Sequence, residues 1–134
     1  MIVAACIDDR GGMLFNRRRQ SQDRLLRQDL LAEAGGRLVW MNGYSARQFA
    51  DAPGDLRCAE DFPRRAGAGE LCFFEDVDPA PYLAEAEGVI LYRWNRRYPA
   101  DQYFPLPLEG WHLVRQEEFA GSSHEKITKE VYAR

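Results

Sequence analysis

The sequence predicts an α/β fold with a mostly parallel sheet, flanking helices and an antiparallel hairpin near the C-terminus. Continuous apolar runs at residues 2–7, 38–41, 71–74 and 89–94 are typical of strands that are buried on both faces of a sheet. Helical or loop segments separate these runs, and that alternation favours parallel strands. Two extended segments then flank Ala120-Gly121-Ser122-Ser123, which indicates a closing hairpin.

The first strand ends at the turn-forming residues 8–12, and a helix is expected over residues 22–34. Within that helix, leucine and alanine recur every four positions, which places them on one face. Ser21 is the expected N-cap, and the carboxylate of Asp23 suits the positive end of the helix dipole. A glycine pair directly after the helix supplies the stop signal.

The middle of the chain carries shorter elements. After the strand at 38–41, the sequence Asn42-Gly43-Tyr44-Ser45 opens a brief helix that reaches about Phe49. Residues 51–69 are rich in turn formers, so we expect a loop with one short strand near residues 56–59. The remaining expected elements are a short helix over residues 79–86 and the two hairpin strands over residues 111–119 and 125–132.

Length and composition indicate one folded domain spanning residues 1–134. The chain has a mass of 15.4 kDa and 46% hydrophobic residues, which suffices for a buried core. Its net charge of −3 argues against nucleic-acid binding by the chain as a whole. Three widely spaced cysteines, and the absence of a signal peptide or a membrane-length apolar run, predict a cytoplasmic protein without a membrane partner. Composition leaves the oligomeric state open.

The order of several short motifs resembles the dihydrofolate reductase family. The first strand leads into a glycine-containing loop that ends in an aromatic–Asn pair, Phe15-Asn16, ahead of the first helix. A strand that ends in a polar turn at a short helix follows at residues 38–45. The late motifs are the strand at 90–94, the Asp-x-x-Phe-Pro segment at 101–105, and Gly110-Trp111 before the hairpin. The resemblance implies a dihydrofolate reductase-like fold with a ligand crevice at the carboxyl ends of the parallel strands.

Three departures from this family pattern bear on NADPH binding. The chain is short between Phe49 and Leu71, where the family places an adenosine-binding strand and helix. The family's Gly-Gly pair after a central strand is replaced by the acidic segment 75–78, which would repel a pyrophosphate group. The family's pterin-binding carboxylate has an approximate counterpart in Asp23. We therefore expect no cofactor and no working NADPH site, with a divergent NADPH-dependent reductase as an alternative.

The arginine-rich loop 10–27 holds six arginines and a single acid, Asp23. Arginines near a helix N-terminus can bind an anion together with backbone N–H groups, which makes Arg17, Arg18 and Arg19 candidate ligand-binding residues. A solvated charged face is the competing interpretation. A further alternative is a nucleic-acid or protein interaction module that uses this loop, although aromatic residues that could stack on bases are scarce nearby.

Asn42, Tyr44 and Ser45 follow the second strand, at the sheet edge where open α/β sheets bind ligands. A helix cap by Asn42 would explain the same residues equally well. Trp94 ends a later strand in a run of cationic and aromatic residues, so it could border the crevice or stack on an arginine for stability. The leading hypothesis is a binding protein, or a minor enzyme, for a small anionic or heteroaromatic ligand. Its predicted ligand-binding residues are Asp23, Arg17, Arg18, Arg19, Asn42, Tyr44, Ser45 and Trp94, without a metal.

Three further patterns favour a structural or negative interpretation. Asp8 and Asp9, together with Asp23, could supply a general base or hold a hydrated magnesium ion, but turn-forming aspartates are far more common. The sequence Ser122-Ser123-His124-Glu125 suggests a catalytic triad, yet neighbours on an extended segment point to opposite faces, so we do not expect them to converge. Residues 119–126 also resemble short bacterial proteins that carry a ribonuclease Z label, but two histidines cannot build the dinuclear zinc site of that enzyme.

Overall fold

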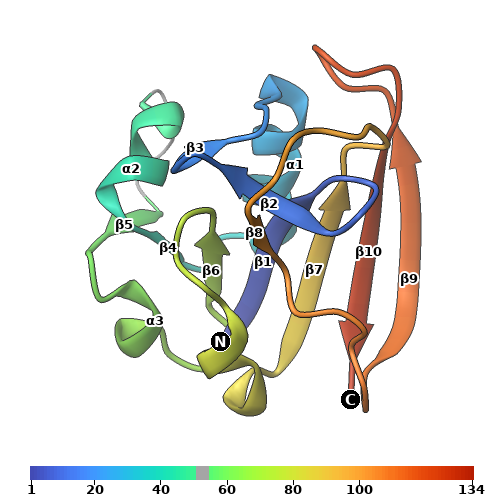
Figure 1. Cartoon of the computed structure of the whole chain (residues 1–134). Helices are drawn as coiled ribbons and strands as arrows, with labels where there is room; N and C mark the ends of the chain where they lie inside the picture. The colour runs from blue at the N-terminus through green and yellow to red at the C-terminus, as the bar shows by residue number, and fades with distance from the viewer. Residues whose placement is uncertain (51–54) are drawn as a thin grey trace.

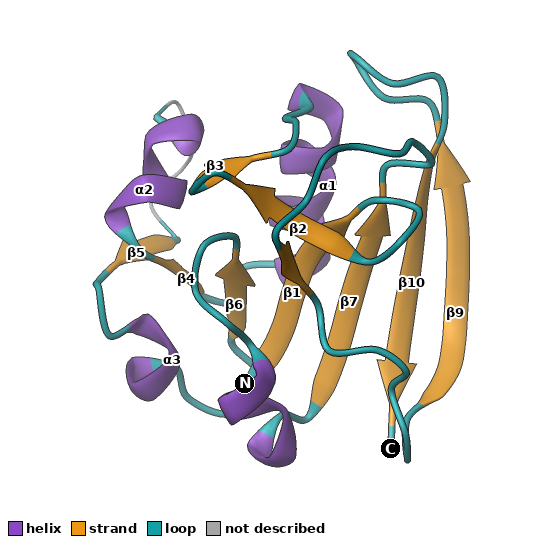
Figure 2. Ribbon diagram, in the orientation of Figure 1, coloured by secondary structure: helices purple, strands orange, loops and turns teal. Residues whose placement is uncertain are grey.

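The structure is a computed structural model that describes residues 1–50 and 55–134 (Figure 1). Its centre is a seven-stranded sheet in the order β5-β4-β6-β1-β7-β10-β9 (Figure 2). The strands are β1 (Ile2–Ile7), β4 (Val39–Met41), β5 (Leu56–Cys58), β6 (Leu71–Phe74), β7 (Gly88–Arg93), β9 (His112–Phe119) and β10 (Ile127–Ala133).

Five neighbouring strands, from β5 to β7, run parallel, and β10 and β9 complete the sheet in antiparallel orientation. This arrangement confirms the predicted mostly parallel sheet with its antiparallel C-terminal hairpin. The central strands β1, β6 and β7 are largely buried, as their continuous apolar sequences indicate. Because parallel strands share one direction, the carboxyl ends of β1, β6 and β7 meet at the same edge, the upper one in Figure 1.

The first helix, α1 (Arg24–Ala34), buries Leu26, Leu30 and Ala34 against the sheet. Its N-cap is Asp23, whose carboxylate accepts the backbone N–H groups of the following turn at 3.0 and 3.1 Å. The prediction of Ser21 as the cap was therefore wrong, because Asp23 lies closer to the first free N–H groups and also contacts a distant turn, as described below. Gly35 ends the helix in the left-handed conformation, with a φ of 57°.

The shorter helices lie largely where the sequence predicts them. Phe62 lies on an unpredicted helical turn, and its ring packs against Phe74 with ring centroids 5.1 Å apart, so the segment that was expected to be a loop contributes to the core. Residues 51–54 of that expected loop lie outside the described residues. No helix in the described part of the chain is long and apolar enough to cross a membrane. The short helices are α2 (Gly43–Ala46), η1 (Arg47–Phe49), the unpredicted α3 (Phe62–Arg65) and η2 (Ala80–Glu85).

A second, three-stranded sheet was not predicted. It consists of β2 (Gly12–Phe15), β3 (Arg18–Arg19) and β8 (Gln102–Tyr103), in the order β3-β2-β8. A two-residue turn, Asn16-Arg17, joins β2 to β3, and both residues have positive φ values of 51° and 62°. Such turns match the natural twist of a hairpin. The hairpin, which carries Arg17, Arg18 and Arg19, lies near the carboxyl ends of the central strands of the large sheet (Figure 1).

Asp8 organises the loop that follows β1. Its carboxylate is 1% exposed and accepts the backbone N–H groups of Arg10 and Gly12 at 2.9 and 2.8 Å. It also accepts the side-chain amide of Gln20 and the backbone N–H of Tyr98, both at 3.2 Å. The structural, turn-forming interpretation of Asp8 is thereby confirmed. Through these bonds, Asp8 ties β1, the β2–β3 hairpin and the segment after β7 together.

Candidate ligand-binding crevice

A crevice opens where β1, β6 and β7 end and the hairpin approaches the start of α1. Its inner part is a cavity of about 10 Å³, the size of a single water molecule. An outer groove of about 210 Å³ adjoins it, and Arg19 and Gln20 line both spaces. The inner cavity is lined by Cys6, Met13, Arg19, Gln20, Ser21, Phe74, Glu75 and Trp94, and the outer groove by Phe15, Asn16, Arg18, Arg19, Gln20, Tyr98 and Pro99.

One wall of the crevice is an ion pair between Arg19 and Glu75. The guanidinium donates from Nε and Nη2 to the two carboxylate oxygens of Glu75 at 3.0 and 3.1 Å. Ser45 donates its hydroxyl to Glu75 at 2.8 Å, and the guanidinium lies over the ring of Tyr44, 4.3 Å from its centroid. Burial opposes the charge of Arg19, but its hydrogen bond with Glu75 and the charge of that residue raise the pKa of Arg19. We call Arg19, Tyr44, Ser45 and Glu75 the Glu75 cluster.

The N-terminus of α2 is occupied by side chains of the protein itself. The carbonyl oxygen of the Asn42 side chain accepts the backbone N–H of Ser45 at 3.1 Å, and its amide donates to Asp76 at 2.8 Å. Glu60 accepts the backbone N–H of Gly43 at 2.9 Å. The cap by Asn42 that the sequence allowed is therefore present. The N–H groups of Gly43 and Ser45 at the start of the helix are therefore already hydrogen-bonded to internal acceptors.

The opposite wall is built around His124, which is 5% exposed. Its Nδ1 lies 3.1 Å from Oδ2 of Asp23, and its Nε2 lies 3.1 Å from Oγ of Ser21 and 3.0 Å from the hydroxyl of Tyr98. Trp94 stacks on the imidazole with ring centroids 4.4 Å apart. The alternative that Trp94 stacks on an arginine was therefore wrong. We call Ser21, Asp23, Trp94, Tyr98 and His124 the His124 cluster.

Asp23 uses both carboxylate oxygens within the protein. Oδ1 accepts three backbone N–H groups, two from α1 and one from Ser122, while Oδ2 accepts from the backbone and hydroxyl of Ser123 and faces His124. Burial alone would raise the pKa of Asp23, but the N–H groups of Ser122 and Ser123 and the hydrogen bond of His124 together lower it. Asp23 therefore connects α1 to the turn between β9 and β10.

The backbone of that turn is not extended, contrary to expectation, although Ser123, His124 and Glu125 do not form a triad, as expected. Residues 121–125 bend instead of extending, so Ser123 and His124 both reach Asp23 even though they are neighbours in sequence. Gly121 lies so close to Asp23 that a β-carbon at this position would overlap the carboxylate. Glu125 remains exposed. Four contacts from this turn to the distant carboxylate of Asp23 hold the backbone in a bent conformation.

Gln20 carries an unsatisfied oxygen between the two walls. Its amide nitrogen donates to Asp8 and to the backbone carbonyl of Pro99, at 3.2 and 3.3 Å. Both partners are acceptors, so the orientation of the amide is fixed by its contacts. The other amide atom, Oε1, is buried and has no hydrogen-bond partner among the described residues. A buried acceptor of this kind requires a donor from water or a ligand.

The structure brings most of the predicted ligand-binding residues to this crevice. Arg19, Tyr44 and Ser45 lie in the Glu75 cluster with Asn42 beside them, and Asp23 and Trp94 lie in the His124 cluster. Arg18 lines the outer groove, and Arg17 is exposed at the tip of the hairpin. Sequence reasoning did not assign Gln20, Ser21, Glu75, Tyr98 and His124 to the site. The signal for His124 was present, since a polar Ser-Ser-His run interrupts the hairpin, but nothing local identifies its partner.

The three cysteines should differ sharply in reactivity. Burial, together with the charges of Glu75 and Asp23, raises the pKa of Cys6, and burial raises the pKa of Cys72 to about 12. Cys58 is exposed. We expect one thiol per native chain to react rapidly with a disulfide reagent such as DTNB and the other two only after unfolding. A Cys58→Ser variant should lose the fast reaction, and a persistent fast reaction would contradict this assignment.

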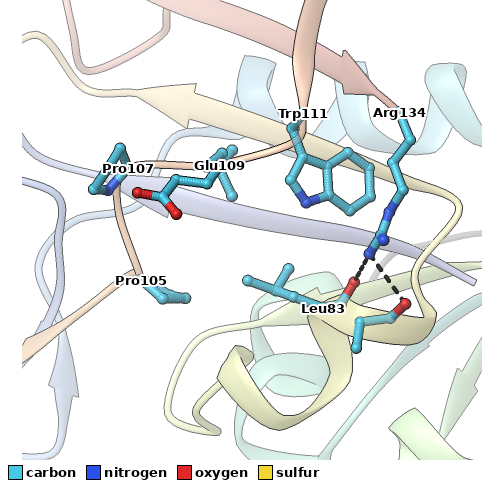
Figure 3. Close-up of a pocket in the computed structure, with 8 residues that line it drawn as sticks. Leu83, Pro105, Pro107, Glu109, Trp111 and Arg134 are labelled. Atoms are coloured by element: carbon cyan, nitrogen blue, oxygen red, sulfur yellow. Dashed lines mark hydrogen bonds between the residues drawn. The ribbon is translucent and has the colours of Figure 1, made fainter.

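A larger pocket lies at the opposite end of the strands from the crevice, near the chain termini. It measures about 320 Å³ and is lined by Leu83, Pro105, Pro107, Glu109 and neighbouring residues (Figure 3). Trp111 and Arg134 lie side by side along it, with the guanidinium 4.4 Å from the centre of the indole ring. Arg134 also donates hydrogen bonds to the backbone carbonyls of Leu83 and Ala84, so its guanidinium already has partners within the protein. This pocket lacks the buried ionisable groups of the crevice.

Within residues 1–50 and 55–134, no group of three or more His, Cys, Asp or Glu side chains is placed to hold a metal ion. No protein-family model matches the chain, and no curated protein matches it in sequence. Among solved structures, dihydrofolate reductase from Enterococcus faecalis, complexed with NADP(H) and RAB-propyl, is similar with a TM-score of 0.68. The match covers 100% of this chain and 96% of that chain at 9% sequence identity, a level at which the likeness concerns the fold. The chain thus has a dihydrofolate reductase-like fold, as the sequence motifs implied.

Proposed function

We propose that the protein binds a small heteroaromatic molecule with a negatively charged group in the outer groove and crevice, without NADPH. The groove of about 210 Å³ has the size of a small ring system with one substituent. Arg18 lines it and is exposed, so its guanidinium is available to an anionic group. Tyr98 and Phe15 supply aromatic surface against which a ring can stack.

The observation that carries this proposal is the unsatisfied Oε1 of Gln20. Gln20, which carries this buried acceptor, lines both the groove and the inner cavity, and a ring N–H or amino group that reached Oε1 would satisfy it. Buried ionisable groups surround it on both walls, and such groups gather at functional sites more often than elsewhere. A ligand with a donor on one side and an anionic group on the other would match both Gln20 and Arg18.

NADPH is disfavoured here by the internal hydrogen bonds of α2 and not by repulsion from Glu75. Glu75 was expected to repel a pyrophosphate, but Arg19 balances its charge. What disfavours a phosphate here is that Glu60 and Asn42 already accept the N–H groups of Gly43 and Ser45 at the N-terminus of α2, and that Asp76 accepts a hydrogen bond from Asn42. A phosphate would have to displace these internal acceptors. We therefore expect NADPH to leave the thermal unfolding temperature unchanged.

A thermal-shift screen with pterins, folates, purine nucleotides and NADPH tests this function. We expect at least one anionic heteroaromatic compound to raise the unfolding temperature, and the Arg18→Ala variant to bind it about tenfold more weakly. The matched control is Arg64→Ala, which removes an exposed arginine from α3, away from the crevice. The proposal fails if no compound of this class shifts unfolding, or if both variants bind equally. Stabilisation by NADPH would instead support the divergent reductase.

One observation favours a second candidate, the nucleic-acid interaction module. Phe15 on β2 and Tyr103 on β8 are each 48% exposed, and Arg17 and Arg18 lie exposed beside Phe15. The small sheet thus supplies a second aromatic residue that the sequence did not place near the arginines. Exposed aromatics with adjacent arginines can stack on single-stranded bases. Binding of single-stranded RNA that is lost in both Arg18→Glu and Tyr103→Ala, with small-ligand shifts intact, would establish this candidate.

A further inference from the structure

We propose that Ser21 is a nucleophile activated by His124, with Asp23 as the positioning residue, and that the crevice cleaves small anionic carboxylic esters. The inference rests on the proposed function in one respect, because the anionic part of the substrate would lie in the same groove, which adjoins the small cavity that Ser21 lines. The observation behind it is a Ser–His–Asp arrangement assembled from both ends of the chain. Ser21 Oγ lies 3.1 Å from Nε2 of His124, and Nδ1 lies 3.1 Å from Asp23.

The contacts of the imidazole determine its tautomer. Asp23 can only accept hydrogen bonds when it is ionised, so Nδ1 of His124 carries the proton and donates it to Oδ2. The lone pair of a neutral ring then lies on Nε2, which faces the hydroxyls of Ser21 and Tyr98. Stacking on Trp94 restricts rotation of the ring. This is the orientation in which histidine accepts a proton from a serine.

Ser21 differs from the other serine near this histidine in the ring nitrogen that it faces. It lines the inner cavity and lies on the Nε2 side, whereas Ser123, although exposed, donates to the backbone carbonyl of Gln22 and lies on the Nδ1 side with Asp23. A serine on the Nδ1 side cannot give its proton to Nε2. The geometry therefore distinguishes the two serines by role, and Ser123 provides an internal control.

The reaction follows from these positions. Ser21 Oγ forms a bond to the ester carbonyl carbon, its proton moves to Nε2 of His124, and the carbonyl electron pair moves onto oxygen. When the carbonyl re-forms, the bond to the leaving alcohol breaks and His124 protonates the departing oxygen. Water then attacks the acyl group by the same route, releases the carboxylic acid and returns the proton to Ser21. No oxidant, metal or co-reactant is needed.

Tyr98 has a defined part in the first step. Its hydroxyl lies 3.0 Å from Nε2. Once that nitrogen has taken the proton from Ser21, it no longer accepts, and the Tyr98 hydroxyl is free to donate to the oxygen that gains negative charge. Arg18, at the mouth of the groove, favours esters whose acyl or alcohol part is anionic.

A small alkyl fluorophosphonate tests the nucleophile directly. Attack by Ser21 forms an oxygen–phosphorus bond and expels fluoride, so we expect one adduct per chain on the peptide that contains Ser21. Ser21→Ala should abolish labelling, Ser123→Ala should retain it, and His124→Gln should slow it about 100-fold. Asp23→Asn should also slow labelling about 100-fold at equal folded fraction while groove ligands still raise the unfolding temperature.

The result separates this inference from ligand binding. If the wild type is not labelled, or if Ser21→Ala is labelled at the wild-type rate, the inference is overturned even where the thermal shifts persist. Ser21 is partly exposed and small, so its replacement by alanine preserves the fold and keeps the test decisive. If labelling occurs at Ser21 but no heteroaromatic ligand binds, the assignment of Ser21 as a nucleophile is supported and the proposed class of ligand is refuted.

Discussion

Replacing Arg19 by alanine should destabilise the protein by about 3 kcal/mol, because Glu75 would become an uncompensated charge in the interior. The carboxylate of Glu75 is 8% exposed and receives two hydrogen bonds from the guanidinium. Arg19 itself remains 22% exposed, which places the effect at the lower end of the range for buried pairs. Urea unfolding monitored by tryptophan fluorescence measures the difference.

Two further variants isolate the cause. Arg18 precedes Arg19 on the same short strand but is exposed, so Arg18→Ala should change the free energy of unfolding by less than about 0.5 kcal/mol. Adding Glu75→Gln to Arg19→Ala removes the orphaned charge and should restore about half of the lost stability. Equal effects of Arg18→Ala and Arg19→Ala would show that the ion pair does not stabilise the fold.

Replacing Asp23 by asparagine should lower the free energy of unfolding by about 2–3 kcal/mol at neutral pH. Asparagine still caps a helix, so the loss comes from the charge-assisted hydrogen bonds to the turn at Ser122 and Ser123 and to His124. Ser21→Ala, in the same loop but on the other side of the imidazole, should cost less than about 1 kcal/mol. Urea unfolding of the two variants gives the comparison.

The effect of Asp23→Asn should depend on pH. The folded pKa of Asp23 is lower than the unfolded value of about 3.9, so its contribution is present above that value and lost as the pH falls through the folded pKa. The difference between wild type and variant should therefore be largest above about pH 5 and shrink below pH 4. Glu33 also has a lowered pKa, so it reduces the stability of wild type and variant alike at low pH. Its contribution therefore cancels when the two free energies of unfolding are subtracted. A difference that grows on acidification would refute this account.

Local patterns account for most of the large sheet and α1. A continuous apolar run is a property of consecutive residues, so β1, β6 and β7 were predictable, as were the fourfold spacing of α1 and its glycine stop. The small sheet was not predictable in this way. β3 is two residues long, and Arg17 stands in the turn position where glycine usually signals a hairpin. Because an arginine and not a glycine occupies this positive-φ position, the sequence gives no hairpin signal, and the segment was interpreted as a charged loop.

The sequence predicts the region of the candidate site but not the contacts of its individual residues. Strand ends in an open α/β sheet mark the crevice, and this rule located Asn42, Tyr44 and Ser45. The roles depend on pairings across the chain that no local pattern encodes. Asp23 and His124 are 101 positions apart, and Arg19 and Glu75 are 56 apart. Glu75 was consequently treated as a repulsive charge, although the structure supplies its counter-ion.

The distance in sequence between the two halves of the His124 cluster has a consequence for protein synthesis. During translation, Ser21 and Asp23 leave the ribosome long before His124 is made, and α1 then lacks the turn that covers its capping carboxylate. The central parallel strands can pair earlier, since β1, β6 and β7 all precede residue 94. The proposed reaction at Ser21 would therefore begin only after chain elongation has passed the β9–β10 turn, because a nascent chain that stalls before that point lacks His124.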